Sequence, residues 1–437
     1  MPPLRVGLIG LGTVGSGVMR LLAEHSDRIA HRAGRVLEIT RVAVRDPAKP
    51  RSLTVPDDRL TDDPVCVAND PKIDAIVELI GGLHPAKEVI LAALESGKDV
   101  VTANKALLCA EGPALFQAAR AAGRCIAFEA AVAGGIPVIH VLGQAMAANQ
   151  ITAIEAILNG TSNFILTEML HGGESYADAV GKAQSLGFAE ADPAMDVDGT
   201  DAAQKLCLLT QLAFGTRVTP NQFSRQGIDT LDLTDLQYAH ELGYAVKLLA
   251  TAKLVDGRLE MHTQPTLIRH GRPIAQVVGA FNMVALSGDA VGPTWYSGQG
   301  AGQMPTASAV VSDLIDVAIG RAQLTFERLD LWEERPAVPI QPAEDSYRRY
   351  YLRFPVEDRP HVIADITDIL GRQSISLASV IQHEAPEVEE VDSDQIPPVP
   401  LVIMTHRSRE GQIRAAAAEL NELSTVRKPW VCMPVSD

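Results

Sequence analysis

Short apolar runs alternate with amphipathic stretches through the first 130 residues of the chain. Strands are predicted at Arg5–Ile9, Val36–Val44, Ala75–Ile80, Asp99–Thr102 and Cys125–Phe128, and helices at Thr13–His25, Pro85–Leu94 and Pro113–Ala122. Strands that alternate with helices are typical of a parallel sheet with helices on both faces. We therefore predict an α/β fold class with a doubly wound domain over residues 1–134.

The pattern becomes mixed after residue 134. Predicted strands are Thr152–Leu158, Ala250–Leu254, Leu259–Leu267 and Ala275–Leu286, and predicted helices are Ser162–Leu170 and Tyr176–Leu186. This mixture indicates an α+β domain over residues 135–304, which we expect to hold substrate and to oligomerise. A long helix from about Pro305 to Arg321 follows, and residues 305–325 are expected to pack back on the first domain.

The last hundred residues form a third part of the chain. Residues 335–346 are rich in proline and lack any periodicity, so they are predicted to be a linker. Residues 347–437 then show the order strand, helix, strand, strand, helix, strand, which is typical of a ferredoxin-like domain. An acidic, proline-containing stretch at Glu384–Pro400 is predicted to be a solvated loop.

Charge and cysteine usage exclude several classes of function. The 437 residues carry a formal net charge of −16, which argues against a nucleic-acid or anionic-membrane partner. The five cysteines are scattered and form no CxxC pair, as expected for reduced thiols in a cytoplasmic protein. The chain contains no apolar run of the roughly 18 residues that a membrane span requires.

Four acids and one lysine lie between residues 192 and 205, directly before an apolar helix. Asp201 and Lys205 are four residues apart, so they share one face of a helix. The apolar residues on that face are Ala202, Leu208, Leu209 and Leu212, whereas Gln204, Thr210 and Gln211 lie on the opposite face. A charge pair at one end of an apolar stripe indicates a catalytic cleft.

The segment Gly10-Leu-Gly12-Thr-Val-Gly15 follows a predicted strand and opens a predicted helix. Glycines at this spacing permit a tight turn and close approach of a pyrophosphate, so the segment predicts a Rossmann-type dinucleotide site. At the end of the second strand Arg45 precedes Asp46. The arginine favours the additional phosphate of NADP, and the aspartate keeps NAD possible.

Two further segments lie where parallel strands are expected to end. Thr102-Ala-Asn104-Lys105 places a lysine at the carboxyl edge of the sheet, where ligands bind in open α/β folds. Glu129–Pro137 is a small-residue crossover whose backbone carbonyls and one carboxylate could hold a hard cation. On composition alone, a tight interdomain crossover is the favoured interpretation of this second segment.

The stretch from Ala183 to Lys205 (AQSLGFAEADPAMDVDGTDAAQK) resembles the signature of homoserine dehydrogenases. The cofactor turn, the Thr102–Lys105 segment and Asn159-Gly-Thr-Ser-Asn163 agree with the same family, and so does the domain order. The resemblance covers essentially the whole chain. It implies reversible hydride transfer between NADP(H) and the pair L-homoserine and L-aspartate 4-semialdehyde. The apolar mixed-sheet core and the ACT-like module described below both favour a homodimer or homotetramer.

The resemblance also implies roles for individual residues. Lys205 would be the general acid and base, with Lys105 as the second lysine near substrate and nicotinamide. The implied substrate-binding residues are Glu190, Asp196 and Asp201. The implied cofactor-binding residues are Gly10, Gly12, Thr13, Val14, Gly15, Arg45, Lys105, Gly187 and Gly302. The implied sodium or potassium site consists of Glu129, Val132, Gly134 and Ile136.

Residues 347–437 resemble ACT amino-acid-binding modules through Asp358-Arg-Pro-His361-Val-Ile. That family usually has glycine where His361 stands, and glycine allows the backbone to approach a ligand closely. We therefore expect an ACT-like regulatory domain in which inhibition by threonine is weak or absent.

Two alternative functions are considered. An aldehyde dehydrogenase of the aspartate-semialdehyde type would need a thiolate paired with histidine, and Cys125 and Cys207 lack an obvious partner. A non-catalytic ACT-containing sensor would not need the Asp201–Lys205 pair. The protonation state of Lys205 is left open, because burial and Lys105 would lower its pKa while Asp201 would raise it.

Overall fold

The chain divides into two units in the computed structural model. The first comprises Met1–Ile154, Ala203–Pro220 and Phe281–Val338, and the second comprises Glu155–Ala202, Asn221–Ala280 and Pro339–Asp437. The structure describes all residues except 52, 54, 330, 333–336, 384–397 and 437. Strand β7 (Ile151–Ile157) and helix α10 (Thr200–Phe214) run from one unit into the other. Within the described part of the chain, no helix is long and apolar enough to cross a membrane.

The first unit contains a parallel sheet of six strands in the order β3-β2-β1-β4-β5-β6. The strands are β1 (Leu4–Ile9), β2 (Leu37–Ala43), β3 (Leu60–Thr61), β4 (Ala75–Glu78), β5 (Asp99–Thr102) and β6 (Ile126–Ala127). The helices between them are α1 (Thr13–Glu24), α2 (Ser26–Ala33), α3 (Pro64–Asn69), α4 (Ala86–Glu95) and α5 (Lys105–Ala121). The predicted Rossmann-type sheet is confirmed.

The same unit also contains α6 (Val138–His140), the hairpin β11 (Phe281–Gly288) and β12 (Gly292–Gln299), and the helices α12 (Gln303–Ala318) and α13 (Arg321–Leu329). Helix α12 packs closely on α1, because a Cβ atom on Gly17 would lie 2.9 Å from Gln303. The helix predicted from about Pro305 to Arg321 is observed as α12, which ends three residues early at Ala318. Gly320, with a φ of +80°, separates it from α13.

Two other predicted boundaries need correction. Helix α5 begins at Lys105 rather than Pro113, and it runs through that proline. The strand predicted over Ala275–Leu286 starts at Phe281. The residues before it belong to the second unit, where Pro273–Gln276 forms a 3-10 turn. No element was predicted from the sequence at α2, β3, α3, α6 or β12. Side chains in β12 are alternately half-buried and exposed, so this strand lacks the apolar run used to find the others.

The second unit contains a sheet in which β9 (Tyr244–Val255) and β10 (Arg258–Arg269) form a long antiparallel hairpin. The sheet continues through β17 (Val431–Ser436), β13 (Tyr347–Val356), β15 (Val399–Thr405) and β14 (Leu377–Gln382). The short strands β8 (Ser224–Arg225) and β16 (Ser408–Arg409) pair with β10 and β13. The helices are α7 (Gly160–Gly172), α8 (Tyr176–Ser185), α9 (Ala194–Val197), α11 (Leu233–Glu241), α14 (Val362–Arg372) and α15 (Glu410–Leu420).

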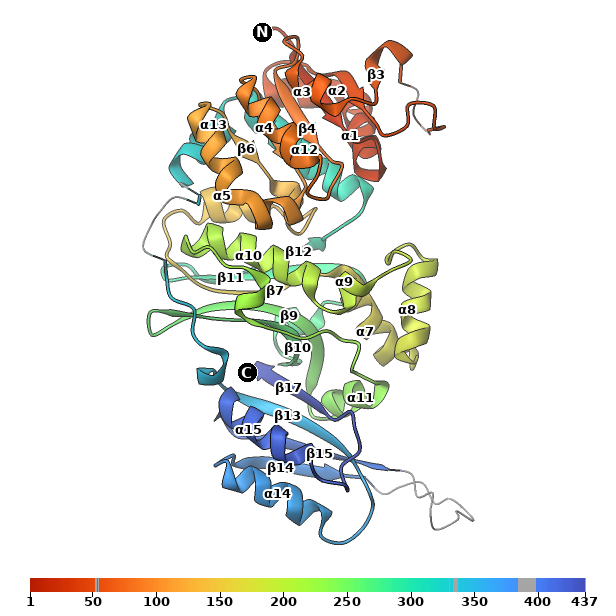
Figure 1. Cartoon of the computed structure of the whole chain (residues 1–437), viewed down its shortest axis with the longest axis vertical. Helices are drawn as coiled ribbons and strands as arrows, with labels where there is room; N and C mark the ends of the chain where they lie inside the picture. The colour runs from red at the N-terminus through yellow and green to blue at the C-terminus, as the bar shows by residue number, and fades with distance from the viewer. Residues whose placement is uncertain (52, 54, 330, 333–336, 384–397, 437) are drawn as a thin grey trace. The chain divides into compact units, whose positions relative to one another are not determined.

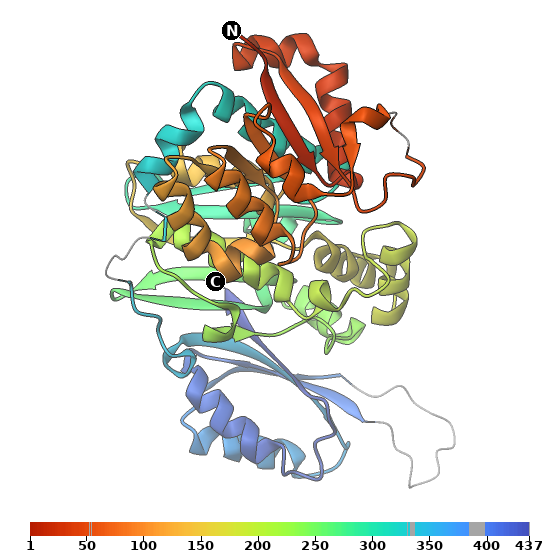
Figure 2. The same ribbon diagram turned by 45° about the horizontal axis from the view of Figure 1, so that its top comes forward.

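Strands β13, β14, β15 and β17 with helices α14 and α15 have the predicted ferredoxin-like order. Both helices cover the same face of this sheet, as Figures 1 and 2 show. Ile366 and Ile413 from the two helices join Phe354 and Ile403 from the strands in one buried apolar core. Residues 384–397 of the predicted acidic loop and residues 335 and 336 of the predicted linker lie outside the described residues.

Candidate active site

The glycine turn after β1 forms a cradle at the start of α1. A Cβ atom on Gly15 would lie 2.1 Å from the Gly10 carbonyl oxygen, so the turn tolerates no side chain at that position. Gly12 has no atom within 4 Å of such a Cβ, and it caps α1 just before Thr13 and Val14. First-turn amides lack acceptors within their own helix and favour an anion. The turn therefore fits the pyrophosphate of a dinucleotide.

The loop after β2 presents Arg45 to solvent. The Asp46 carboxylate accepts a hydrogen bond from the Ala48 backbone N–H at 2.9 Å, and Arg51 donates to the Asp46 carbonyl at 2.5 Å. Asp46 and Arg51 thus help to close the loop on itself, whereas Arg45 is exposed directly beyond the strand. Gly302, another predicted cofactor residue of this unit, caps the start of α12 with a φ of +114°.

The strand predicted at Asp99–Thr102 is confirmed, and Lys105 follows it as the first residue of α5. Asn104 caps the helix by accepting from the Leu107 backbone N–H at 3.1 Å, and its amide donates to the Gly82 carbonyl at 2.7 Å. The Thr102 hydroxyl accepts from the Asn104 backbone N–H at 3.0 Å. These bonds fix the half-buried Lys105 at the carboxyl edge of the sheet.

A buried carboxylate, Glu78, supports the same edge and was missed in the sequence. It accepts from the Thr102 hydroxyl at 2.6 Å and from the backbone N–H groups of Ile80 and Gly81 at 2.9 and 3.1 Å. Glu78 thereby joins the ends of β4 and β5. Its signal in the sequence is a single acid within the apolar run Ala75–Ile80.

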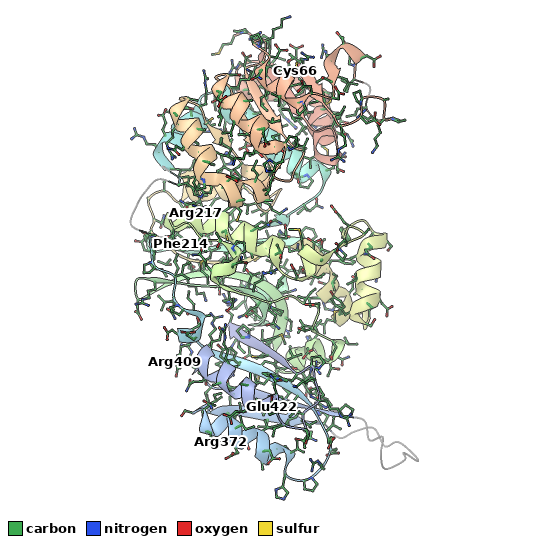
Figure 3. All side chains as sticks on the ribbon, viewed as in Figure 1. Cys66, Phe214, Arg217, Arg372, Arg409 and Glu422 are labelled. Carbon is green, nitrogen blue, oxygen red and sulfur yellow. The ribbon has the colours of Figure 1, made fainter. Side chains whose placement is uncertain are left out.

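Asp201 and Lys205 lie one turn apart on α10, the helix that ends at Phe214 (Figure 3). Asp201 is buried and Lys205 is half-buried. Thr210 and Gln211, which were assigned to the polar face, are also buried. The polar face of α10 is therefore not a solvent-facing side, because this helix is packed on both sides.

Asn159 joins two of the predicted substrate-binding acids in the second unit. Its amide nitrogen donates to Asp196 at 2.7 Å and to Asp201 at 3.0 Å. Its amide oxygen accepts from the Ser162 backbone N–H at 2.8 Å and so caps α7. This cap positions both carboxylates from one buried side chain. Glu190 is exposed after α8 and lies outside this network, as does Gly187.

A buried lysine on β9 was also missed. Lys247 donates to the Asn163 amide oxygen at 3.1 Å and to the Val277 carbonyl at 2.5 Å. Burial lowers the pKa of Lys247 to about 8. Asn163 in turn donates to the Gly279 carbonyl at 2.8 Å. The signal in the sequence is a lone lysine within an apolar strand, and its contacts hold the Asn159–Asn163 segment against the 277–279 loop.

The crossover predicted to hold a cation is built around Glu129. This carboxylate accepts from the backbone N–H groups of Ile139 and His140 at 3.0 and 2.8 Å, and it also contacts the His140 ring. The other ring nitrogen of His140 lies 2.9 Å from Asp316. Hydrogen bonds to Asp316 and Glu129 raise the pKa of His140 to about 10. The Glu129 carboxylate therefore caps α6 and does not fit the role of a cation ligand.

The remaining members of the predicted cation site are Val132, Gly134 and Ile136. Any ligand atoms they supply are backbone carbonyls, and the Ile136 carbonyl already accepts from the Val138 N–H at 2.7 Å. The described residues include no group of three or more His, Cys, Asp or Glu side chains arranged to hold a metal. A cation at this crossover would rest on backbone oxygens alone.

The cysteines considered for thiolate chemistry are buried in the first unit. Burial raises the pKa of the Cys125 thiol. The pKa of the Cys207 thiol is also raised, mainly by its hydrogen bond with Cys109 and further by burial. Neither thiol is poised as a thiolate, so the geometry does not support the aldehyde dehydrogenase alternative.

The chain is similar to known proteins along nearly its full length. Residues 10–129 match the family model of the homoserine dehydrogenase NAD binding domain, and residues 137–315 match that of homoserine dehydrogenase. A homoserine dehydrogenase of Pseudomonas aeruginosa is 43% identical over 438 residues, covering 99% of this chain and 98% of that protein.

Solved structures give the same result. A homoserine dehydrogenase from Thiobacillus denitrificans is similar with a TM-score of 0.91 and 43% identity, covering 100% of this chain and 98% of that one. A hyperthermophilic archaeal homoserine dehydrogenase in complex with NADPH is similar with a TM-score of 0.62 and 26% identity, covering 73% of this chain and 98% of that one.

Proposed function

Because the chain belongs to the homoserine dehydrogenase family, we propose that Lys205 and Lys105 serve the proton transfer of that family's reaction. The enzyme interconverts L-homoserine and L-aspartate 4-semialdehyde with NAD(P), a step of aspartate-family amino-acid biosynthesis. The observation that carries the proposal for Lys105 is the Glu78–Thr102–Asn104 network, which fixes this lysine at the carboxyl edge of the sheet. Lys205 is proposed from its place in the family signature.

The bound dinucleotide supplies or accepts the hydride, and the protein orients the substrate and moves the proton. In the reducing direction Lys205 protonates the oxygen that becomes the homoserine hydroxyl, and in the oxidising direction it takes that proton back. Asp196 and Asp201 are proposed to bind the polar groups of the substrate, because Asn159 holds both carboxylates in one place. We also propose that Glu190 binds the substrate and that Gly187 and Gly302 line the nicotinamide.

NADP is the proposed preferred cofactor, and Arg45 is its proposed determinant. The exposed guanidinium follows β2 directly, and a homoserine dehydrogenase relative has been solved with NADPH. We expect Arg45→Ala to lower kcat/KM for NADPH about tenfold, since one charge-assisted contact to phosphate is lost, and to leave NADH nearly unaffected. Initial rates with both cofactors measure this ratio. Lys49→Ala, in the same loop, is the matched control, and an unchanged cofactor ratio in Arg45→Ala would exclude the assignment.

A sodium or potassium ion held by backbone carbonyls of the Glu129–Ile136 crossover is also proposed. Such an ion would stiffen the segment that leaves β6. Replacing sodium and potassium with choline at constant ionic strength is expected to lower the initial rate several-fold, because choline is too large for a carbonyl cage. Equal rates in all three salts would count against the ion.

The remaining assignments concern organisation. We propose residues 1–134 as the dinucleotide-binding domain, residues 135–304 as the substrate and oligomerisation domain, and residues 347–437 as an ACT-like regulatory domain. His361 has a φ of +77° at the start of α14, a conformation that favours glycine and agrees with the glycine usual there. A homodimer or homotetramer is proposed, and light scattering of the full chain measures it.

A further inference from the structure

A polar cavity of about 200 Å³ lies in the second unit, among strands β9, β10, β13 and β17. Its volume is several times what one water molecule requires. Thr251 and His262 face each other across the β9–β10 hairpin, and Lys253 pairs with Glu260 on the same face. One wall of the cavity is therefore a stripe of polar side chains on one face of a regular hairpin.

Three buried side chains in this lining have polar atoms without a hydrogen-bond partner in the described part of the chain. They are the Thr251 hydroxyl, the Nδ1 atom of His262, and the Nε and Nη1 atoms of Arg348. Thr251, His262 and Arg348 are 2%, 5% and 9% exposed, so bulk water cannot readily replace the hydrogen bonds that these atoms lack. Buried polar groups in proteins are nearly always paired, so an unpaired set that lines one cavity is suited to bind a polar ligand.

The charges of the lining define the chemistry of that ligand. Among the described residues the cations are Lys253, Arg348, Arg349 and Arg407, and the carboxylates are Glu155 and Glu260. The two acids are already engaged, since Glu155 lies 2.9 Å from Lys253 and Glu260 lies 2.7 Å from Arg348. Cations thus outnumber carboxylates by four to two among the described lining residues, on a chain whose formal net charge is −16.

We propose that this cavity binds a small oxyanion, a carboxylate or a phosphate, held by Arg348 with Thr251 and His262. Arginine donors match the oxygens of both groups, and the hydroxyl and imidazole can complete the hydrogen bonds. The site joins the β9–β10 hairpin to the first and last strands of the ACT-like domain. It is separate from the Asp358–His361 segment by which ACT modules were recognised in the sequence.

Isothermal titration calorimetry of the full chain tests the proposal with inorganic phosphate and succinate as probes, each against sodium chloride at equal ionic strength. Binding of either probe supports the site, and the stronger of the two identifies which oxyanion it prefers. Saturable heat with neither probe up to tens of millimolar would overturn the proposal.

Variants locate the binding within the cavity. Thr251→Val removes only the unpaired hydroxyl, and we expect several-fold weaker binding. Arg348→Lys retains a charge opposite Glu260 but loses the second donor group, and about tenfold weaker binding is expected. Thr263→Val is the matched control for Thr251→Val. Thr263 follows His262 on β10, and its buried hydroxyl also has no hydrogen-bond partner among the described residues, but it does not line the cavity. Equal weakening by Thr251→Val and Thr263→Val, or undiminished binding in Arg348→Lys, would place the anion elsewhere and refute the assignment.

Discussion

Lys205→Ala is expected to lower kcat/KM for homoserine oxidation by about 10²- to 10⁴-fold, the usual contribution of a positioned general acid or base. Lys205 is half-buried on α10, one turn beyond Asp201, and alanine is a good helix former, so the helix should persist. NADPH binding is expected to be unchanged, because the phosphate cradle is the turn from Gly10 to Gly15. Initial rates and NADPH fluorescence titration measure the two quantities separately.

Gln204→Ala is the matched control for this experiment. It changes the preceding residue of α10, which is also half-buried and whose amide oxygen lacks a partner among the described residues. We expect its rate to stay within about twofold of wild type, because no proton passes through an amide. If Lys205→Ala also retains its rate within tenfold while binding NADPH normally, Lys205 is not the acid and base.

Features with a local cause could be predicted from the sequence. The turn from Gly10 to Gly15 could be predicted because its glycine spacing is a local feature, and the structure shows a steric requirement for glycine at Gly10 and Gly15. The strand and helix order of residues 347–437 was likewise readable from periodicity, since both helices bury one apolar face. The family signature from Ala183 to Lys205 is also contiguous, and the comparisons confirm the family it indicated.

Features that depend on distant partners could not be predicted. Glu78 and Asn159 organise the site through hydrogen bonds to Thr102 and Asp201, which are 24 and 42 residues away. The burial of α10 has the same kind of cause. Thr210 lies on the polar face of this helix, yet other parts of the fold bury it, so the polarity of a side chain on a helix does not determine its exposure.

Arg353→Met is expected to lower the free energy of unfolding by about 3–5 kcal/mol, the cost of leaving one partner of a buried ion pair alone. Arg353 is 6% exposed on β13, and its Nε atom lies 2.6 Å from Asp235, which is fully buried on α11. Burial already raises the pKa of Asp235 in spite of the arginine. Without Arg353 this carboxylate would be buried without a counter-ion. Urea titration followed by fluorescence measures the change.

Two further variants test whether the loss of stability comes from the unpaired buried carboxylate or from removing an arginine side chain as such. The double variant Asp235→Asn/Arg353→Met removes both charges, so it should lose less stability than Arg353→Met alone. Arg372→Met breaks an ion pair of similar length, 2.7 Å to Glu419, at the exposed end of α14 (Figure 3), and should remain within about 1 kcal/mol of wild type. If Arg353→Met unfolds at the same urea concentration as Arg372→Met, the Arg353–Asp235 pair does not anchor the ACT-like strands to α11. If the double variant is no more stable than the single one, the loss comes from packing rather than from an unpaired carboxylate.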